Sequence, residues 1–302
     1  MAKKRPCGAG GWIRVTGGPG GEVLLLTAAE KTALYDCGMG CFSKQLIENI
    51  KRELKGRPLD YLLLSHTHYD HLGAMPYLRK EFPEMKSVCS AYGQYVLTRK
   101  SALDVIRSMS EAADADYKHL GADLQPYDDA DLSVDIVVKE GDKLDLGGQT
   151  VVVYETPGHT KCSIAFYIPE TGVLLSSEST GVGTPADGIS VPFLTGYKDT
   201  MDSIEKCRKI GAKYIYSTHY LQIPDEDTDR YWDAAIEYAE SYKNFLVDRM
   251  KSGLSDEEVL MACKERNWVD SVQDEQPWPA FKANTVAQIN LIRREFADEL
   301  AN

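Results

Sequence analysis

Three of the six histidines of this 302-residue chain fall within six consecutive residues, His66-Thr67-His68-Tyr69-Asp70-His71. In an extended or turning backbone, His66 and His68 lie on one side, and Asp70 and His71 follow past the turn. Imidazole nitrogens and carboxylate oxygens are the ligands that zinc and similar transition metals prefer. The stretch therefore predicts a place where two neighbouring metal ions are held.

The competing interpretation is that these histidines only satisfy hydrogen bonds. That interpretation is favoured for His119, which lies alone in a charged helical segment. It is disfavoured for the stretch 66–71, because titratable groups packed together without a cation would shift one another's pKa values unfavourably.

Three further candidate ligands follow other predicted strands. His159 lies in the turn Thr156-Pro157-Gly158-His159-Thr160, where proline and glycine favour a sharp bend. Glu178 follows the strand predicted at 173–177, and His219 follows the strand predicted at 214–216. Loops at the ends of strands are where α/β proteins place their sites. We therefore expect these residues to meet the 66–71 stretch at one edge of the fold.

The elements that must position these residues alternate between short strands and helices over the first 222 residues. A helix is predicted at 42–54, because Leu46, Ile50 and Leu54 recur at helical spacing. Residues 74–125 are predicted to be a mainly helical cap or insertion, and 199–210 another helix. Apolar or β-branched runs predict strands at 12–16, 23–27, 32–35, 59–64, 134–138, 151–154, 164–168, 173–175 and 214–216.

The glycine-rich stretch 17–21 is interpreted as a hairpin turn. It lacks the Gly-Lys-Ser/Thr ending of a phosphate-binding loop and does not open a helix. We therefore expect it to shape the backbone and not to bind a nucleotide.

Beyond Pro224 the pattern is helical only. Amphipathic stripes predict three helices, and the second begins at Ser255 with a capping box to Glu258. We therefore divide the chain into a domain at 1–222 and a C-terminal helical lid at 223–302. Six aromatic residues of this segment are interpreted as helix packing in preference to a substrate pocket: Tyr231, Trp232, Tyr238, Tyr242, Trp278 and Phe281.

Composition restricts the partners. The 34 basic and 46 acidic residues leave a net charge of −12, which disfavours nucleic acid and anionic membranes as partners. The longest apolar runs, of about five residues, are far too short for a membrane span of about 20. The basic cluster at 3–5 precedes no apolar signal region, and the seven cysteines form no framework, so a cytoplasmic location and ordinary buried thiols are predicted.

These motifs, taken in order, resemble the metallo-β-lactamase-fold metallohydrolases, which include glyoxalase II and acyl-homoserine lactonases. The resemblance covers about residues 12–220 and includes the Asp-x-Gly turn at 36–38, the His-x-His-x-Asp-His signature at 66–71 and Pro-Gly-His-Thr at 157–160. It also includes the strand-end residues Glu178 and His219. The C-terminal helices are similar to those of quinolone-signal response proteins with thioesterase activity.

The resemblance implies a four-layer αββα sandwich of the α/β class, with a C-terminal helical extension and a two-metal site at its edge. By residue, His66, His68 and His159 would hold the first metal, Asp70, His71 and His219 the second, and Glu178 would bridge. Zinc is the favoured metal, with iron or manganese as alternatives.

One position departs from the family pattern. The usual bridging residue is an aspartate in a Gly-Asp pair, whereas here the strand end reads Ser176-Ser177-Glu178-Ser179. Glutamate reaches one carbon further, so the distance between the metal ions or the choice of metal can differ. A site that binds only one ion, or that hydrolyses its substrate slowly, is an alternative. Asp187, further along a loop, is the poorer candidate.

The predicted activity is metal-dependent hydrolysis of a small-molecule thioester, lactone or ester by a metal-bridging hydroxide, with Asp70 also transferring a proton. No serine or cysteine nucleophile is indicated. An iron-dependent oxidoreductase or dioxygenase with the same ligands, and a ligand-responsive signalling protein without turnover, are the alternatives. The net charge disfavours a nuclease, and the sequence does not determine the oligomeric state.

Overall fold

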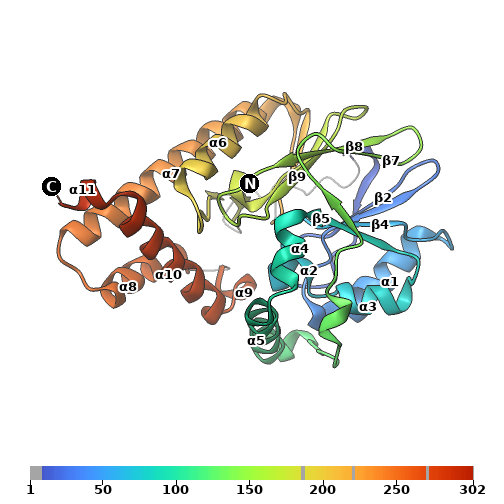
Figure 1. Cartoon of the computed structure of the whole chain (residues 1–302), viewed down its shortest axis with the longest axis horizontal. Coiled ribbons are helices and arrows are strands. Elements are labelled where there is room, and N and C mark those ends of the chain that lie inside the picture. Colours follow the sequence, from blue (N-terminus) through green and yellow to red (C-terminus); the bar gives the residue numbers. More distant parts are fainter. Residues whose placement is uncertain (1–8, 185–187, 220–221, 270–271, 302) are drawn as a thin grey trace.

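Two six-stranded sheets face each other at the centre of the computed structural model, which describes residues 9–184, 188–219, 222–269 and 272–301 (Figure 1). In the first sheet β1, β2 and β3 are antiparallel and β3 to β6 are parallel. Its strands, in spatial order, are β1 Trp12–Arg14, β2 Leu24–Thr27, β3 Thr32–Tyr35, β4 Tyr61–Leu63, β5 Lys86–Ser90 and β6 Ile136–Val138.

The second sheet is antiparallel except where β10 and β13 pair in parallel. Its strands, in spatial order, are β14 Gln222–Ile223, β13 Tyr214–Tyr216, β10 Val173–Leu175, β9 Ile164–Ile168, β8 Thr150–Glu155 and β7 Lys143–Asp145. A separate hairpin pairs β11 Val182–Gly183 with β12 Ile189–Ser190.

Helices cover the outer faces of both sheets. Leu34 and Leu62 point from the first sheet into a core shared with helix residues such as Ile50. The helices that follow strands of this sheet are α1 Ser43–Leu54, α2 Tyr69–Leu72, α3 Met75–Glu81, α4 Ala91–Leu97 and α5 Lys100–Asp116. A second core, including Trp12 and Phe166, fills the space between the sheets. These layers confirm the expected αββα sandwich.

The outer face of the second sheet is covered by α6 Tyr197–Arg208 and the first half of α7 Thr228–Lys251. Tyr231 and Trp232 of α7 are buried in one cluster with Leu174 and Ile215 of the sheet. The start of the C-terminal segment therefore packs as part of the sandwich. The division at residue 222 and the lid role stay predictions.

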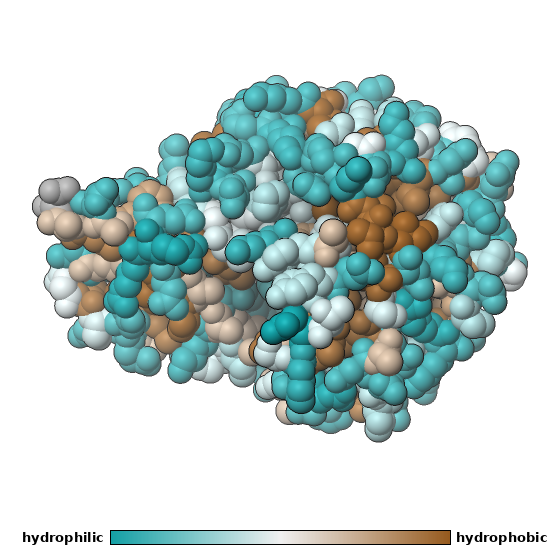
Figure 2. Space-filling model, viewed as in Figure 1, coloured by the Kyte–Doolittle hydropathy of each residue, from teal (hydrophilic) through white to brown (hydrophobic). Residues whose placement is uncertain are grey.

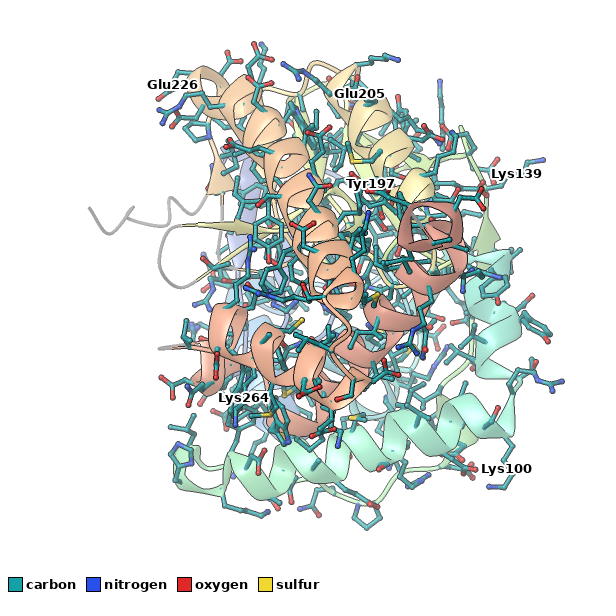
Figure 3. All side chains as sticks on the ribbon, turned by 90° about the vertical axis from the view of Figure 1, so that its left-hand side faces the viewer. Lys100, Lys139, Tyr197, Glu205, Glu226 and Lys264 are labelled. Carbon is teal, nitrogen blue, oxygen red and sulfur yellow. The ribbon has the colours of Figure 1, made fainter. Side chains whose placement is uncertain are left out.

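The remaining C-terminal helices are α8 Asp256–Asn267, α9 Val272–Glu275, α10 Trp278–Glu295 and α11 Ala297–Ala301. α10 contacts both α7 and α5, α8 packs on α7 and α10, and α11 packs on α7 and α10. In Figure 3 Lys264 marks α8, which lies between α7 and α5, and Lys100 marks α5. The capping box of Ser255 and Glu258 is present. The six aromatic residues are all buried or partly buried in these packing clusters, in line with the packing interpretation.

Five of the described strands were not predicted: β5, β7, β11, β12 and β14. Residues 74–125 are mainly helical as predicted, but β5 runs through them between β4 and β6. Only Val88 and Cys89 in Lys86–Ser90 are apolar, so the run is too short to show a strand period. Pairing with two parallel neighbours stabilises it instead.

The surface and the thiols agree with the composition. The face shown in Figure 2 is largely hydrophilic, with apolar side chains gathered in a few small areas. Within the described residues, six cysteines are buried and free: Cys37, Cys41, Cys89, Cys162, Cys207 and Cys263. None of the described helices is long and apolar enough to cross a membrane.

Candidate metal centre

All seven predicted site residues meet at one edge of the sandwich. Each follows the end of a strand: the stretch 66–71 follows β4, His159 follows β8, Glu178 follows β10 and His219 follows β13. Their ligand atoms form two groups, each within 4.8 Å, that share Glu178. Group one is His66, His68, His159 and Glu178, and group two is Asp70, His71, His219 and Glu178. The assignment of these residues as metal ligands stays a prediction.

Glu178 connects the groups through both of its carboxylate oxygens. Oε1 lies 2.9 Å from His71 Nε2 and 3.3 Å from His219 Nε2, both in group two. Oε1 also lies 3.5 Å from His66 Nε2, and Oε2 lies 3.4 Å from His159 Nε2, both in group one. A carboxylate in this position can contact two cations at once.

The remaining short distances complete each group. In group one, His68 Nδ1 lies 3.0 Å from His159 Nε2. In group two, Asp70 Oδ2 lies 3.4 Å from His71 Nε2 and 3.8 Å from His219 Nε2. The nitrogens of several rings therefore converge on the same space as the carboxylates.

Two buried nitrogens test whether cations fit here. Within the described part of the chain, His66 Nε2 and His71 Nε2 make no hydrogen bond of good geometry, although Glu178 Oε1 lies 3.5 Å and 2.9 Å from them. A buried polar atom without a partner costs free energy, and a metal ion bound at these nitrogens would remove that cost. The imidazole and carboxylate donors suit zinc, iron or manganese. The residues present therefore fit a pair of divalent cations.

The electrostatics of the site favour ligand forms for most of its members. Burial lowers the pKa of His66 well below its usual value, and burial with His159 nearby lowers that of His68 to about 4. Burial alone would raise the carboxyl pKa values, but His71 lowers that of Asp70 to about 2, and His159 and His219 lower that of Glu178. Neutral imidazoles and ionised carboxylates are the forms that bind metals.

His71 and His219 differ from the other histidines. Burial opposes protonation, but Asp70 and Asp36 raise the pKa of His71, and Glu178 raises that of His219. Binding of a cation at group two would therefore displace protons from these rings.

Asp36 supports both groups from beneath. It lies just past β3 at a φ of 52°, and its Oδ1 accepts a hydrogen bond from the Ser65 amide at 2.7 Å. Its Oδ2 accepts from Ser65 Oγ at 2.7 Å and from His71 Nδ1 at 2.9 Å. Ser65 Oγ in turn lies 3.0 Å from His66 Nδ1. These bonds turn the Nε2 atoms of both rings toward Glu178.

Sequence reasoning missed these supporting contacts. Asp36 was noted only as part of a turn, although an acidic residue directly after a buried strand is a signal for such a role. His159 Nδ1 donates to the Pro192 carbonyl at 2.6 Å. Every residue has a backbone carbonyl, so the sequence does not indicate which one accepts this bond. Holding the second ring nitrogen is the common way in which proteins orient a ligand histidine.

Two other candidates lie elsewhere. His119 is exposed, and its Nδ1 lies 3.0 Å from the Asp116 carbonyl, so it belongs to neither group. Asp187 lies outside the described residues.

Comparison with known proteins gives the same family signal in sequence and in structure. The profile of the Metallo-beta-lactamase superfamily matches residues 16–219. An anaerobic nitric oxide reductase flavorubredoxin from Klebsiella pneumoniae is 28% identical over 158 residues, which is 52% of this chain but only 27% of that protein. The match therefore spans about a quarter of the length of that relative.

Two solved structures show the same fold. A metallo-beta-lactamase family protein from Thermus thermophilus superposes with a TM-score of 0.60 at 20% identity, covering 95% of this chain and 94% of the other. A flavo di-iron protein from Thermotoga maritima superposes with a TM-score of 0.54 at 16% identity, covering 72% of this chain and 53% of the other.

Proposed function

Because the chain belongs to the metallo-beta-lactamase superfamily, we propose that it is a hydrolase of a small thioester, lactone or ester that works with two divalent metal ions, preferably zinc. The observation that carries the proposal is the position of Glu178. Its two oxygens face histidines of both groups at 2.9–3.5 Å, which supports a bridging role for this carboxylate.

The chemistry of hydrolysis divides between the metal ions and the chain. Bound metal ions would supply Lewis acidity and an activated water near neutral pH. The chain holds the ligand rings rigidly, because Asp36, Ser65 and the Pro192 carbonyl bind the nitrogens that face away from the centre.

Asp70 is the proposed proton carrier. Its Oδ2 lies beside His71 and His219, and its pKa of about 2 keeps it ionised at neutral pH. We assign Oδ2 the role of accepting a proton from the attacking water and returning it to the leaving group.

An iron-dependent oxidoreductase is the second candidate. It is favoured by the names of two similar proteins, a nitric oxide reductase flavorubredoxin and a flavo di-iron protein. Imidazole and carboxylate ligands suit iron as well as zinc. The same seven residues would then serve a redox reaction.

Elemental analysis combined with an activity panel separates the two. We expect purified or zinc-reconstituted protein to carry about two metal ions and to hydrolyse a member of a thioester, lactone and ester panel. Iron-loaded protein should be tested in parallel for reduction of oxygen and nitric oxide. Protein that stays metal-free after exposure to zinc, iron and manganese would refute both functions, and reduction without hydrolysis would favour the second.

A further inference from the structure

The glycine-rich stretch 17–21 lies directly against the group-two residues. A Cβ atom placed on Gly21 would lie 2.5 Å from the Asp70 carbonyl oxygen and 2.8 Å from the His71 ring. A Cβ atom on Gly20 would lie 3.5 Å from Asp70 Cβ. Only glycine permits this approach, so the stretch forms a backbone wall behind Asp70 and His71.

The same stretch also reaches the other histidine of group two, His219. The amide of Glu22, the next residue along the chain, donates to the Thr218 carbonyl at 2.7 Å, and Thr218 precedes His219. Among the described residues, the nearest neighbours of these glycines include no histidine of group one. Movement of residues 17–22 would therefore disturb group two in preference to group one.

A residue of the C-terminal helices holds this stretch in place. The Gly20 amide donates to Glu275 Oε2 at 3.1 Å, a contact between residues 255 positions apart. Glu275 ends α9, and the next carbonyl, that of Gln276, accepts a hydrogen bond from Trp268 Nε1 at 2.9 Å. Trp268 packs on Trp278 with ring centroids 5.1 Å apart. The carboxylate is thus fixed on the packed core of the C-terminal segment.

The hydrogen bond between Gly20 and Glu275 restrains a flexible part of the backbone. Four of the five residues at 17–21 are glycine, which has more backbone freedom to lose than any other residue. A bond from a backbone amide to a carboxylate is charge-assisted and stronger than one between neutral groups. Without it, this glycine-rich wall would sample other conformations.

We propose that Glu275 is a positioning residue that couples the C-terminal helices to group two and selectively strengthens metal binding there. The inference rests on the proposed function only in that the seven residues bind metal. Its prediction is asymmetric: loss of Glu275 weakens the Asp70-His71-His219 site and leaves the His66-His68-His159 site unchanged.

The test is a zinc competition titration of the full chain with a chromophoric chelator. Glu275→Ala should weaken one of the two zinc equivalents about tenfold, the lower end of the effect of losing a residue that supports a metal ligand. Glu275→Gln should lie between wild type and Glu275→Ala, because its amide oxygen still accepts from Gly20 but the bond is no longer charge-assisted. Asp274→Ala, an exposed neighbour on the same short helix, is the matched control and should change nothing.

Two backgrounds assign the affected site. In His68→Ala protein, where group one is damaged, Glu275→Ala should still weaken zinc binding. In His219→Ala protein, where group two is damaged, it should have no effect. Equal zinc affinity with and without Glu275, or equal weakening in both backgrounds, would overturn the inference.

Hydrogen exchange of the metal-free chain gives a readout that needs no zinc. Glu275→Ala should speed exchange of the amides at 20–23 and 70–72, and leave those at 159–164 unchanged. Unchanged exchange throughout would contradict the coupling even if zinc binding proves complex. A wild-type chain that binds no metal refutes the proposed function, whereas two tight sites that ignore Glu275 refute only this inference.

Discussion

Replacing Asp36 by asparagine tests how the buried ligand histidines are oriented. Asparagine has the same shape and tolerates the φ of 52° at this position better than most residues, so backbone strain is kept out of the comparison. Its carbonyl oxygen can still accept from the Ser65 amide. Its NH₂ group then replaces Oδ2, the atom that accepts from Ser65 Oγ and from His71 Nδ1.

The effect on His71 follows from hydrogen-bond polarity. An NH₂ group can only donate, so His71 Nδ1 must become an acceptor and lose its proton, and the neutral ring then carries its one proton on Nε2. Nε2 is the nitrogen that faces Glu178 at 2.9 Å and is predicted to bind metal. We therefore expect zinc affinity at group two to fall by about 10–100-fold. Losing the charged bond should also cost the metal-free protein about 2–3 kcal/mol of unfolding free energy.

Zinc competition and urea denaturation of metal-free protein measure the two effects separately. Asp60→Asn is the matched control, because Asp60 also accepts from a backbone amide, that of Thr32 at 2.8 Å, but is not among the residues grouped around Glu178. It should lose stability without losing zinc affinity. If Asp36→Asn binds zinc as tightly as wild type, the proposed orientation of His71 through Asp36 is refuted.

Three further changes probe the site and the C-terminal segment. Glu178→Asp should lower metal affinity and the rate of hydrolysis, because a side chain one carbon shorter cannot keep contacts of 2.9 Å to His71 and 3.4 Å to His159. Unchanged metal content in both Glu178→Asp and Glu178→Ala would show that Glu178 is no ligand. Gly21→Ala should displace Asp70 and His71 and reduce zinc binding at group two. Gly56→Ala is the control, because an added Cβ there meets open space at a φ of +90°; it should lower the free energy of unfolding by about 1 kcal/mol and leave zinc affinity unchanged. Deleting residues 223–302 should cause aggregation seen by size-exclusion chromatography, because it uncovers apolar side chains such as Leu174 and Ile215; a soluble truncated protein with unchanged kinetics would contradict this packing argument.

Much of the fold was readable from local patterns. The helix at 43–54, most of the strands and the capping box at Ser255 were predicted because apolar spacing and capping chemistry act over a few residues. β5 was missed for the opposite reason. Its two apolar residues carry no period, and it exists because two parallel neighbours supply its hydrogen bonds.

The residues that support the candidate ligands were harder to predict than the candidate ligands themselves. Histidine clusters and strand-end carboxylates show in the sequence because metal chemistry demands those residue types. Asp36, by contrast, acts through Ser65 and His71, which are 29 and 35 positions away. The Pro192 carbonyl acts through a backbone atom that every residue carries, so composition and spacing say nothing about it.

The sequence by itself indicated an α/β fold and which residue types gather at the candidate site, since both depend on residue types and short-range periods, and the resemblance to a family implied the four-layer arrangement. Only the tertiary structure decided how four strand ends place Glu178 between two groups, how α7 joins the layer over the second sheet, and how Glu275 reaches Gly20. The physical reason is that these contacts join segments far apart in the sequence. Packing of whole sheets and helices decides which of them form, and local preferences do not.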